Sequence, residues 1–227
     1  MSDIFREVDE DLRHEQYKRL WDRFGIYVLG VAALIVVAVG GYKFWEWRQA
    51  SQAAATGDSF LAALTLSEEG KHDEAIAALD AVAADGSGDY PMLAIFRNAG
   101  EKEAAGNADG AVAAYDAIAA RSGVPTVIAD LARIRAAVIL VGSQSPEELS
   151  SRIGDLTQTG NPWRFQAREI LGLAAYRAND LDAARGYFDE IVKDQEASQG
   201  VRQRAQLMLA LIQSRKGPPP QPEPGEG

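Results

Sequence analysis

The sequence predicts an all-α protein in which one N-terminal transmembrane helix is followed by a solenoid of helical hairpins. Three observations carry this prediction. Residues 24–42 contain no charged residue, and four later segments begin with Gly or Asn at intervals of 36, 36 and 37 residues. Between those segments lie helical patterns that start near prolines. A repeat of this length is typical of stacked two-helix units, each of which buries its apolar face against its neighbours.

The uncharged stretch, FGIYVLGVAALIVVAVGGY, is long enough to cross a bilayer. Its nineteen residues span roughly 28 Å at ~1.5 Å per residue, close to the ~30 Å thickness of the hydrocarbon core. A buried core helix is usually shorter, and the apolar part of a cleaved signal peptide has only about 7–15 residues. We therefore predict a transmembrane helix over residues 24–44, with those two structures as the alternatives. Aromatic anchors flank it at Tyr17, Trp21, Tyr27, Tyr42, Phe44, Trp45 and Trp47.

The basic residues near this stretch predict its orientation. Between residues 43 and 70 the only bases are Lys43 and Arg48. More bases precede the stretch, namely Arg6, Arg13, Lys18, Arg19 and Arg23. Because Lys and Arg are enriched on the cytoplasmic side of membrane helices, the N-terminus is predicted to be cytoplasmic and the rest of the chain exported, as in a signal-anchored protein.

Composition narrows the possible functions. The chain has 23 Lys and Arg against 33 Asp and Glu, a net charge of −10, and most of the acidic excess lies after residue 50. An acidic exported domain is a poor partner for nucleic acid or anionic lipid. Cysteine is absent, which excludes a thiolate nucleophile and a Cys metal site.

Catalytic residues are not indicated either. The two histidines, His14 and His72, lie on opposite sides of the predicted span, so they cannot form a pair or a triad. His72 precedes Asp73 and Glu74, but a turn followed by a helix cap explains that cluster without a metal. No glycine motif for phosphate occurs. We therefore assign no catalytic, metal or cofactor residue and expect no enzyme and no small-molecule substrate.

Residues 1–23 are predicted to form a cytoplasmic amphipathic helix capped by Ser2 or Asp3. Its apolar residues recur at helical spacing, at Ile4, Phe5, Val8 and Leu12. Such a helix either docks on a partner or on the bilayer surface, or it simply leads into the membrane. The sequence leaves both interpretations open. Residues 45–54 are predicted as a juxtamembrane helix or linker, and the following helical pattern is expected to break at Gly57.

The repeat domain is predicted over residues 55–215. Its repeated segments are GKHDEAIAALDAV from Gly70, GNADGAVAAYDAI from Gly106, GSQSPEELSSRI from Gly142 and NDLDAARGYFDEI from Asn179. Gly and Asn accept the left-handed conformation that ends a helix. Three residues later come the expected helix caps, Asp73, Asp109, Ser145 and Asp182. Small Ala75, Ala111 and Ala184 then allow close helix packing, whereas the third repeat uses Leu149, Ile153 and Leu156.

A first helix is predicted before each later repeated segment, over residues 89–105, 125–141 and 162–178. Pro91, Pro125 and Pro162 stand near the starts of these helices, where a missing N–H is tolerated. A final helix over 198–215 is expected to close the stack with one apolar face, formed by Val201, Ala205, Met208, Leu209 and Ile212. Residues 216–227, with five prolines, are predicted as a disordered tail.

The pattern Gly-x-x-Asp-x-Ala, with Leu171-Gly172 seven residues before Asn179, resembles the tetratricopeptide repeat, a helix–turn–helix unit of about 34 residues. The resemblance covers residues 55–215, with a slightly longer period and without the family's early Trp. With the short leading helix, the single span and the opening DIFREVDE, the whole layout resembles the YfgM-type ancillary subunits of the SecYEG translocon. That resemblance implies a bacterial inner-membrane protein with a periplasmic repeat domain. It also implies translocon subunits, periplasmic chaperones or emerging secretory proteins as partners.

Stacked helix pairs present an extended surface lined by their first helices. The candidate partner-binding groove on these helices comprises Phe96, Arg97, Arg133, Arg164, Arg168 and Tyr176; Arg135 and Arg177 lie on the same helices. Arginines there can pair with partner carboxylates, or they can be ordinary surface charges whose stems pack on the stack. The expected function is a non-enzymatic, membrane-anchored interaction subunit at the translocon. The alternative is a structural scaffold for another envelope process, such as cell division or cytochrome maturation.

Overall fold

The computed structural model describes the backbone of residues 3–216 and the side chains from residue 21 onward, Val28 excepted. Within this range the regular structure is helical throughout, without a strand, which confirms the all-α prediction. The chain divides into two compact units, residues 1–57 and 58–227, which are treated separately below. The predicted Ser2 cap and the tail after residue 216 lie outside the described residues.

The N-terminal helix α1 is a single element that runs from Asp3–Glu68. The expected break at Gly57 does not occur, and from Asp3 onward the segments predicted as 1–23, 24–44 and 45–54 belong to one helix. A glycine inside a helix costs only about 0.5–1 kcal/mol relative to Ala, and the neighbouring alanines favour the helical conformation. The division between the two compact units nevertheless falls directly after this glycine.

In the first unit, α1 carries apolar side chains that no other part of the described chain covers. The exposed fractions lie between 55% and 77% for Ile26, Leu29, Val31, Leu34, Ile35, Val36, Val37 and Val39. Near the start of this segment the Trp21 ring lies against Gly25, where an added Cβ would be 3.1 Å from the ring. Among the described residues this is one helix long and apolar enough, by length and composition, to cross a membrane.

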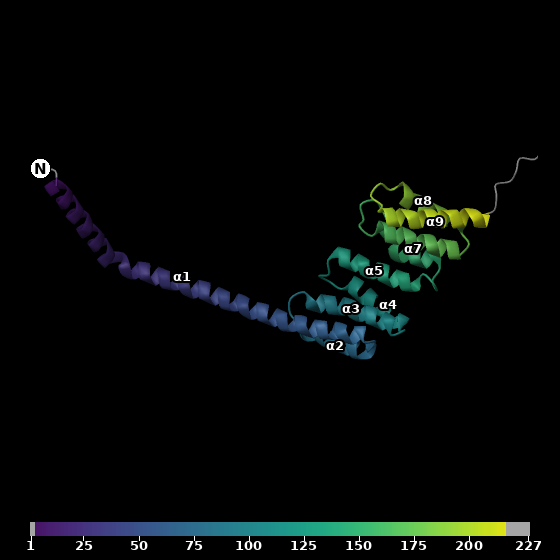
Figure 1. Ribbon diagram of the computed structural model, residues 1–227, viewed down its shortest axis with the longest axis horizontal. Coiled ribbons are helices and arrows are strands. Elements are labelled where there is room, and N and C mark those ends of the chain that lie inside the picture. The colour runs from purple at the N-terminus through teal and green to yellow at the C-terminus, as the bar shows by residue number, and fades with distance from the viewer. Residues whose placement is uncertain (1–2, 217–227) are drawn as a thin grey trace, which may run out of the picture. The chain divides into compact units, whose positions relative to one another are not determined.

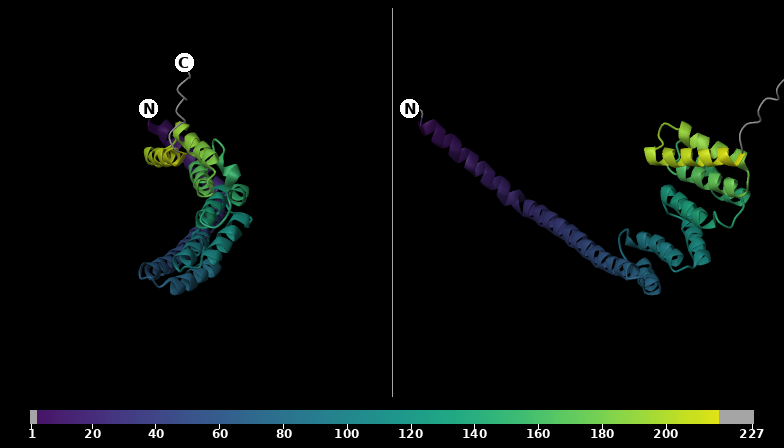
Figure 2. Two further views of the ribbon diagram at one scale, coloured as in Figure 1. Left: turned by 90° about the vertical axis from the view of Figure 1, so that its right-hand side faces the viewer. Right: turned by 45° about the vertical axis from the view of Figure 1, so that its right-hand side comes forward.

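The second unit is a stack of helical hairpins (Figures 1 and 2). Residues 58–68 of α1 pack with α2 (His72–Asp85) to form the first hairpin. The later hairpins are α3 (Tyr90–Ala104) with α4 (Ala108–Ala120), α5 (Thr126–Leu140) with α6 (Pro146–Ile153), and α7 (Arg164–Arg177) with α8 (Leu181–Lys193). Helix α9 (Gln199–Lys216) packs on α8 and α7. First helices also contact one another, α5 with α7 and α7 with α9, so they form one layer.

In each hairpin, a small residue in the first helix allows the second helix to pack closely against it. The small residues Ala63, Ala99, Ala136 and Gly172 are buried in the four successive first helices. A large buried residue comes from each second helix: Leu79, Tyr115, Ile153 and Phe188. The closest approach is at Gly172, where a Cβ would lie 2.9 Å from the ring of Phe188. Leu149, Ile153 and Leu156 are fully buried in the third hairpin, as the sequence predicted.

Three of the four predicted turns have the expected left-handed residue. Gly70, Gly106 and Asn179 have φ of 75°, 82° and 64°. The next residue donates its N–H to a carbonyl five positions earlier in all three turns, Lys71 to Leu66, Asn107 to Lys102 and Asp180 to Ala175, each at 2.9 Å. Such hydrogen bonds are typical of a helix that ends at a left-handed residue, which is usually glycine or asparagine. The turn at Gly142 differs, because Gly142 does not adopt a left-handed conformation.

The predicted helix caps require a correction at three of four positions. The N-cap residues are Lys71, Asn107 and Asp180, and two of them accept a hydrogen bond, Asn107 from Gly110 N and Asp180 from Ala183 N. Asp73, Asp109 and Asp182 lie instead in the first helical turn, where their negative charges interact favourably with the helix dipole. The shift arises because the left-handed turn needs a single residue, so its successor already caps the next helix. Ser145 is the N-cap of α6 and forms a capping box with Glu148.

The C-terminal helix begins and ends within one residue of the prediction. Ala205 and Ile212 of α9 are buried, and Val201, Met208 and Leu209 pack beside them against α7 and α8. Periodicity alone therefore identified the packed face of this helix.

Candidate interaction surface

A hollow of about 330 Å³ lies on the layer of first helices near the start of the repeat domain. Two of the predicted groove residues, Phe96 and Arg97 of α3, line it together with Gly100, Glu103 and Ala104 of the same helix. The other lining residues are Ser67, Glu101, Tyr115 and Arg135. The absence of a side chain at Gly100 leaves room in its wall, since a Cβ there would lie 3.6 Å from the Tyr115 hydroxyl.

The wall of the hollow contains a buried carboxylate, Glu101, whose side chain is 2% exposed. It accepts hydrogen bonds from the Ser67 hydroxyl at 2.7 Å and pairs with His72 Nδ1 at 2.9 Å and with Arg97 at 2.7 Å. Burial alone would raise the pKa of Glu101, but the bonds from Ser67 and His72 and the charge of Arg97 lower it overall. This carboxylate therefore joins α1, α2 and α3 and fixes the position of Arg97.

The rim of the hollow offers both an aromatic surface and an uncompensated charge. The rings of Phe96 and Tyr115 meet edge to face, with centroids 5.3 Å apart. Burial raises the pKa of Tyr115, so its hydroxyl stays neutral near pH 7. Arg135 is exposed and forms no ion pair within the described part of the chain, and Glu103 is likewise exposed. The sequence placed Arg135 on a first helix. Only the fold shows that no carboxylate in the described part of the chain pairs with it.

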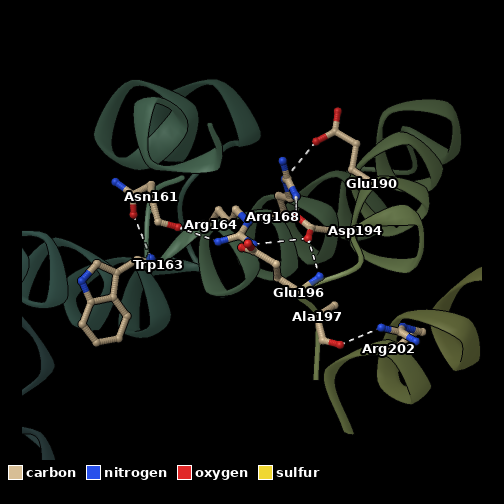
Figure 3. Close-up of polar contacts among 9 residues, drawn as sticks. All are labelled: Asn161, Trp163, Arg164, Arg168, Glu190, Asp194, Glu196, Ala197 and Arg202. Atoms are coloured by element: carbon tan, nitrogen blue, oxygen red, sulfur yellow. Dashed lines mark hydrogen bonds and ion pairs between the residues drawn. The ribbon is translucent and has the colours of Figure 1, made fainter. Parts of the chain in front are cut away.

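Two other predicted groove residues, Arg164 and Arg168, are buried and form ion pairs within the domain. Their side chains are only 6% and 8% exposed, and Figure 3 shows both directed at the segment that follows α8. Arg164 Nε donates to Asp194 at 2.9 Å, and Arg164 also pairs with Glu196; Arg168 pairs with Asp194 at 3.4 Å. The hydrogen bond from Arg164 is the main cause that lowers the pKa of Asp194 to about 2. Arg168 also pairs with Glu190 of α8 at 3.0 Å. The acids that neutralise these arginines carried no sequence signal, because they lie about 20 to 30 residues away in α8 and in the loop that follows it.

Arg133 and Tyr176 are also engaged within the domain. Arg133 donates to the Arg152 carbonyl at 3.0 Å and to Asp155 at 3.0 Å, at the end of α6. The half-buried Tyr176 ring is covered by the Arg215 guanidinium, 5.0 Å from the ring centroid. Of the six predicted groove residues, the structure thus brings only Phe96 and Arg97 together in one hollow.

The groups that line this hollow are suited to binding a partner's side chains. Ser67 and His72 both contact Glu101 rather than each other, so Ser67 lacks the adjacent base that activates a nucleophile. Among the residues described from 21 to 216, no group of three or more His, Cys, Asp or Glu side chains is placed to hold a metal ion. An aromatic edge beside an unpaired guanidinium suits an apolar side chain next to a carboxylate.

The fold defines a class, the helical-hairpin solenoids that act as interaction scaffolds. A family model described as a tetratricopeptide repeat-like domain matches residues 18–214. The chain therefore belongs to the tetratricopeptide repeat-like domain family, and this family's fold indicates a role in protein–protein interaction. The match includes the apolar segment of α1 as well as the hairpins. Comparison with curated proteins and with solved structures finds no match.

Proposed function

We propose that this protein is a membrane-anchored, non-enzymatic interaction subunit that associates with the Sec translocon. In this role its repeat domain contacts periplasmic chaperones or emerging secretory proteins. The observation that carries the proposal is the continuity of α1, whose uncovered apolar segment and first repeat helix belong to one element. A family match that begins at residue 18, before the apolar segment, supports an anchor that belongs to the family's architecture.

The proposed topology has the N-terminus in the cytoplasm of a bacterium and the repeat domain in the periplasm, with one span in the inner membrane. Lys and Arg are more frequent before residue 24 than in the stretch that follows residue 42, which supports this orientation. Because the chain has no cysteine, a single introduced cysteine reports the side of the membrane unambiguously. Gln203→Cys should react with a membrane-impermeant maleimide in intact spheroplasts, and Val8→Cys should react only after lysis. The reverse labelling would overturn the orientation.

The proposed docking surface is the hollow around Phe96 and Arg135. Its aromatic and cationic groups are available there, whereas Arg164 and Arg168 of α7 are neutralised internally. A photoreactive amino acid in place of Phe96 or Arg135 should capture translocon subunits, periplasmic chaperones or nascent secretory chains in living cells. The same residue in place of Ala117, exposed on the second helix α4, is the matched control and should capture far less.

The competing function is a scaffold for another envelope assembly process, such as cell division or cytochrome maturation. Adducts from Phe96 and Arg135 that consist only of proteins from such a process would replace the translocon proposal with the scaffold. Equal capture from Ala117 would show that the hollow is not the docking surface.

A further inference from the structure

Helix α9 repeats the packing pattern of α7 one hairpin later. The residues at the start and along one face of α7 that pack on the third hairpin are Trp163, Ala167, Ile170, Leu171 and Ala174. At a constant distance of 38 positions, α9 packs on the fourth hairpin with Val201, Ala205, Met208, Leu209 and Ile212. All five positions correspond. Helix α9 is therefore the first helix of a fifth hairpin.

The side of α7 that faces its own second helix is covered by α8. Gly172 lies against the Phe188 ring, and Leu173 packs partly buried beside it. The corresponding residues of α9 are Ala210 and Leu211. No helix follows α9 within the described residues, and Leu211 is 43% exposed, with Leu207 one turn earlier at 63%. Terminal units of a solenoid usually have a polar outer face, and these leucines instead form an apolar patch that no described helix covers.

Charge indicates what kind of helix would cover this face. In the complete hairpin, Arg164 pairs with Asp194 and Glu196, which follow the second helix. The corresponding residue of α9 is Arg202, whose Nε is buried without a hydrogen-bond partner and which forms no ion pair among residues 21–216. The side chain of Arg202 donates instead from Nη2 to the Ala197 carbonyl at 2.7 Å, as Figure 3 shows.

The whole of α9 is basic on an otherwise acidic chain. Its sequence contains Arg202, Arg204, Arg215 and Lys216 and no Asp or Glu. Glu169 pairs with Arg204, and Asp182 pairs with Lys216. Arg202 and Arg215 have no carboxylate partner within the described residues, so each end of the exposed leucine pair keeps one uncompensated cation.

We propose that this outer face of α9, centred on Leu207, Ala210 and Leu211, docks an acidic amphipathic helix of a partner protein. That helix completes the fifth hairpin, with its apolar face on the leucines and carboxylates near Arg202 and Arg215. A second copy of this chain fits less well, because pairing two α9 faces would bring the unpaired Arg202 and Arg215 of each copy together. An anionic lipid surface is opposed by the acidic excess of the domain. Residues 217–227 contain no large apolar side chain that could cover the leucines.

The test uses the full chain in phosphatidylcholine nanodiscs and two labelled synthetic amphipathic helices with the same leucine pattern. One peptide has Glu and the other Lys at the positions beside the leucines. Fluorescence anisotropy should give at least tenfold tighter binding of the Glu peptide. The double variant Leu207→Glu and Leu211→Glu should weaken it by at least tenfold, and Arg202→Gln by severalfold. Leu93→Glu, which changes an exposed leucine of α3, is the matched control and should leave binding unchanged.

Several outcomes would overturn the proposal. Equal affinity for the two peptides would show that the charges of Arg202 and Arg215 do not select an acidic helix. Self-association of the full chain that the double variant abolishes would assign the face to a second copy, and binding to phosphatidylglycerol vesicles lost in the same variant would assign it to lipid. Circular dichroism verifies folding, and Leu211→Ser replaces the double variant if that variant does not fold. The surface is separate from the hollow around Phe96, so either proposal can fail while the other stands.

Discussion

The third and fourth hairpins end their helices in different ways. In the fourth, Asn179 adopts a left-handed φ of 64° after α7, and Asp180 caps the thirteen-residue α8. In the third, Gly142 does not adopt that conformation, and α6 has only eight residues before a 3₁₀ turn over Gly154–Thr157. The fourth hairpin is thus delimited by residues next to its own helix ends, whereas the third lacks part of this local signal.

Two arginines that are distant in the sequence supply hydrogen-bond donors at the helix ends of the third hairpin. Arg177 of α7 donates to the carbonyls of Val141 and Gly142, directly after α5. Arg133 of α5 donates to the Arg152 carbonyl near the end of α6. The last carbonyls of a helix need donors, and in a weakly terminated helix a side chain from a neighbour provides them. Arg215 also donates to the Tyr176 carbonyl of the fourth hairpin, at 3.4 Å, but there the left-handed Asn179 already ends the helix. The third hairpin therefore depends more strongly on such tertiary hydrogen bonds.

The largest effect is expected in the fourth hairpin, where packing is tightest. Gly172→Ala places a Cβ 2.9 Å from the buried Phe188 ring and should destabilise the domain by about 2–3 kcal/mol, as overpacking does. Urea unfolding followed by circular dichroism measures the loss. Gly186→Ala in α8 is the matched control, because nothing lies within 4 Å of its Cβ position, and it should stabilise by about 0.5–1 kcal/mol. Equal effects of the two substitutions would contradict the close approach of α7 and α8.

The next effect tests the tertiary closure of the third hairpin. Arg133→Met removes the donors to the Arg152 carbonyl and the ion pair with Asp155, and should cost about 2 kcal/mol. Thermal unfolding gives the loss as a lower Tm. The control is Arg185→Met in the fourth hairpin, where Arg185 and Asp189 form an exposed i,i+4 pair at 3.6 Å that contributes only about 0.3–0.5 kcal/mol. If Arg185→Met lowered the Tm as much as Arg133→Met, the third hairpin would not depend on tertiary hydrogen bonds more than the fourth.

A smaller effect separates the two turns directly. Asn179→Ala removes the short polar side chain that makes the left-handed conformation tolerable and should destabilise by about 1 kcal/mol, whereas Asn179→Gly should not. Gly142→Ala meets neither a left-handed φ nor a neighbouring atom within 4 Å and should be close to neutral. Chemical denaturation of the three variants measures these differences. A destabilising Gly142→Ala would mean that the third turn is locally encoded after all.

The last expected effect concerns pH. Asp194 has a pKa lowered to about 2 by Arg164, against about 3.9 for an unfolded Asp, so its contribution to stability is present above about pH 4 and lost as the pH falls toward 2. The Tm difference between the native chain and Asp194→Asn should therefore shrink over that window. Arg133 also lowers the pKa of Asp155, but this carboxylate is 59% exposed, so Asp155→Asn should show a weaker pH dependence. A Tm difference for Asp194→Asn that stays constant from pH 5 to pH 2 would contradict this linkage.

The sequence by itself determined the helical class, the long apolar segment and the repeat period. Charge-free length and the recurrence of glycine or asparagine are local properties that need no knowledge of packing, and the buried face of α9 followed from periodicity alone. It also determined the degenerate core of the third repeat, Leu149, Ile153 and Leu156, because apolar spacing persists when the small residue is lost.

Only the tertiary structure decided which polar side chains remain available. Arg164 and Arg135 look alike in the sequence, since both lie on first helices, but the first is buried against Asp194 and Glu196 while the second stays exposed at the hollow. The distinction depends on acids about 30 residues away that reach Arg164 only when a loop folds back. A charged side chain is neutralised by whichever groups lie within a few ångströms, and that neighbourhood is a property of the fold rather than of the local sequence.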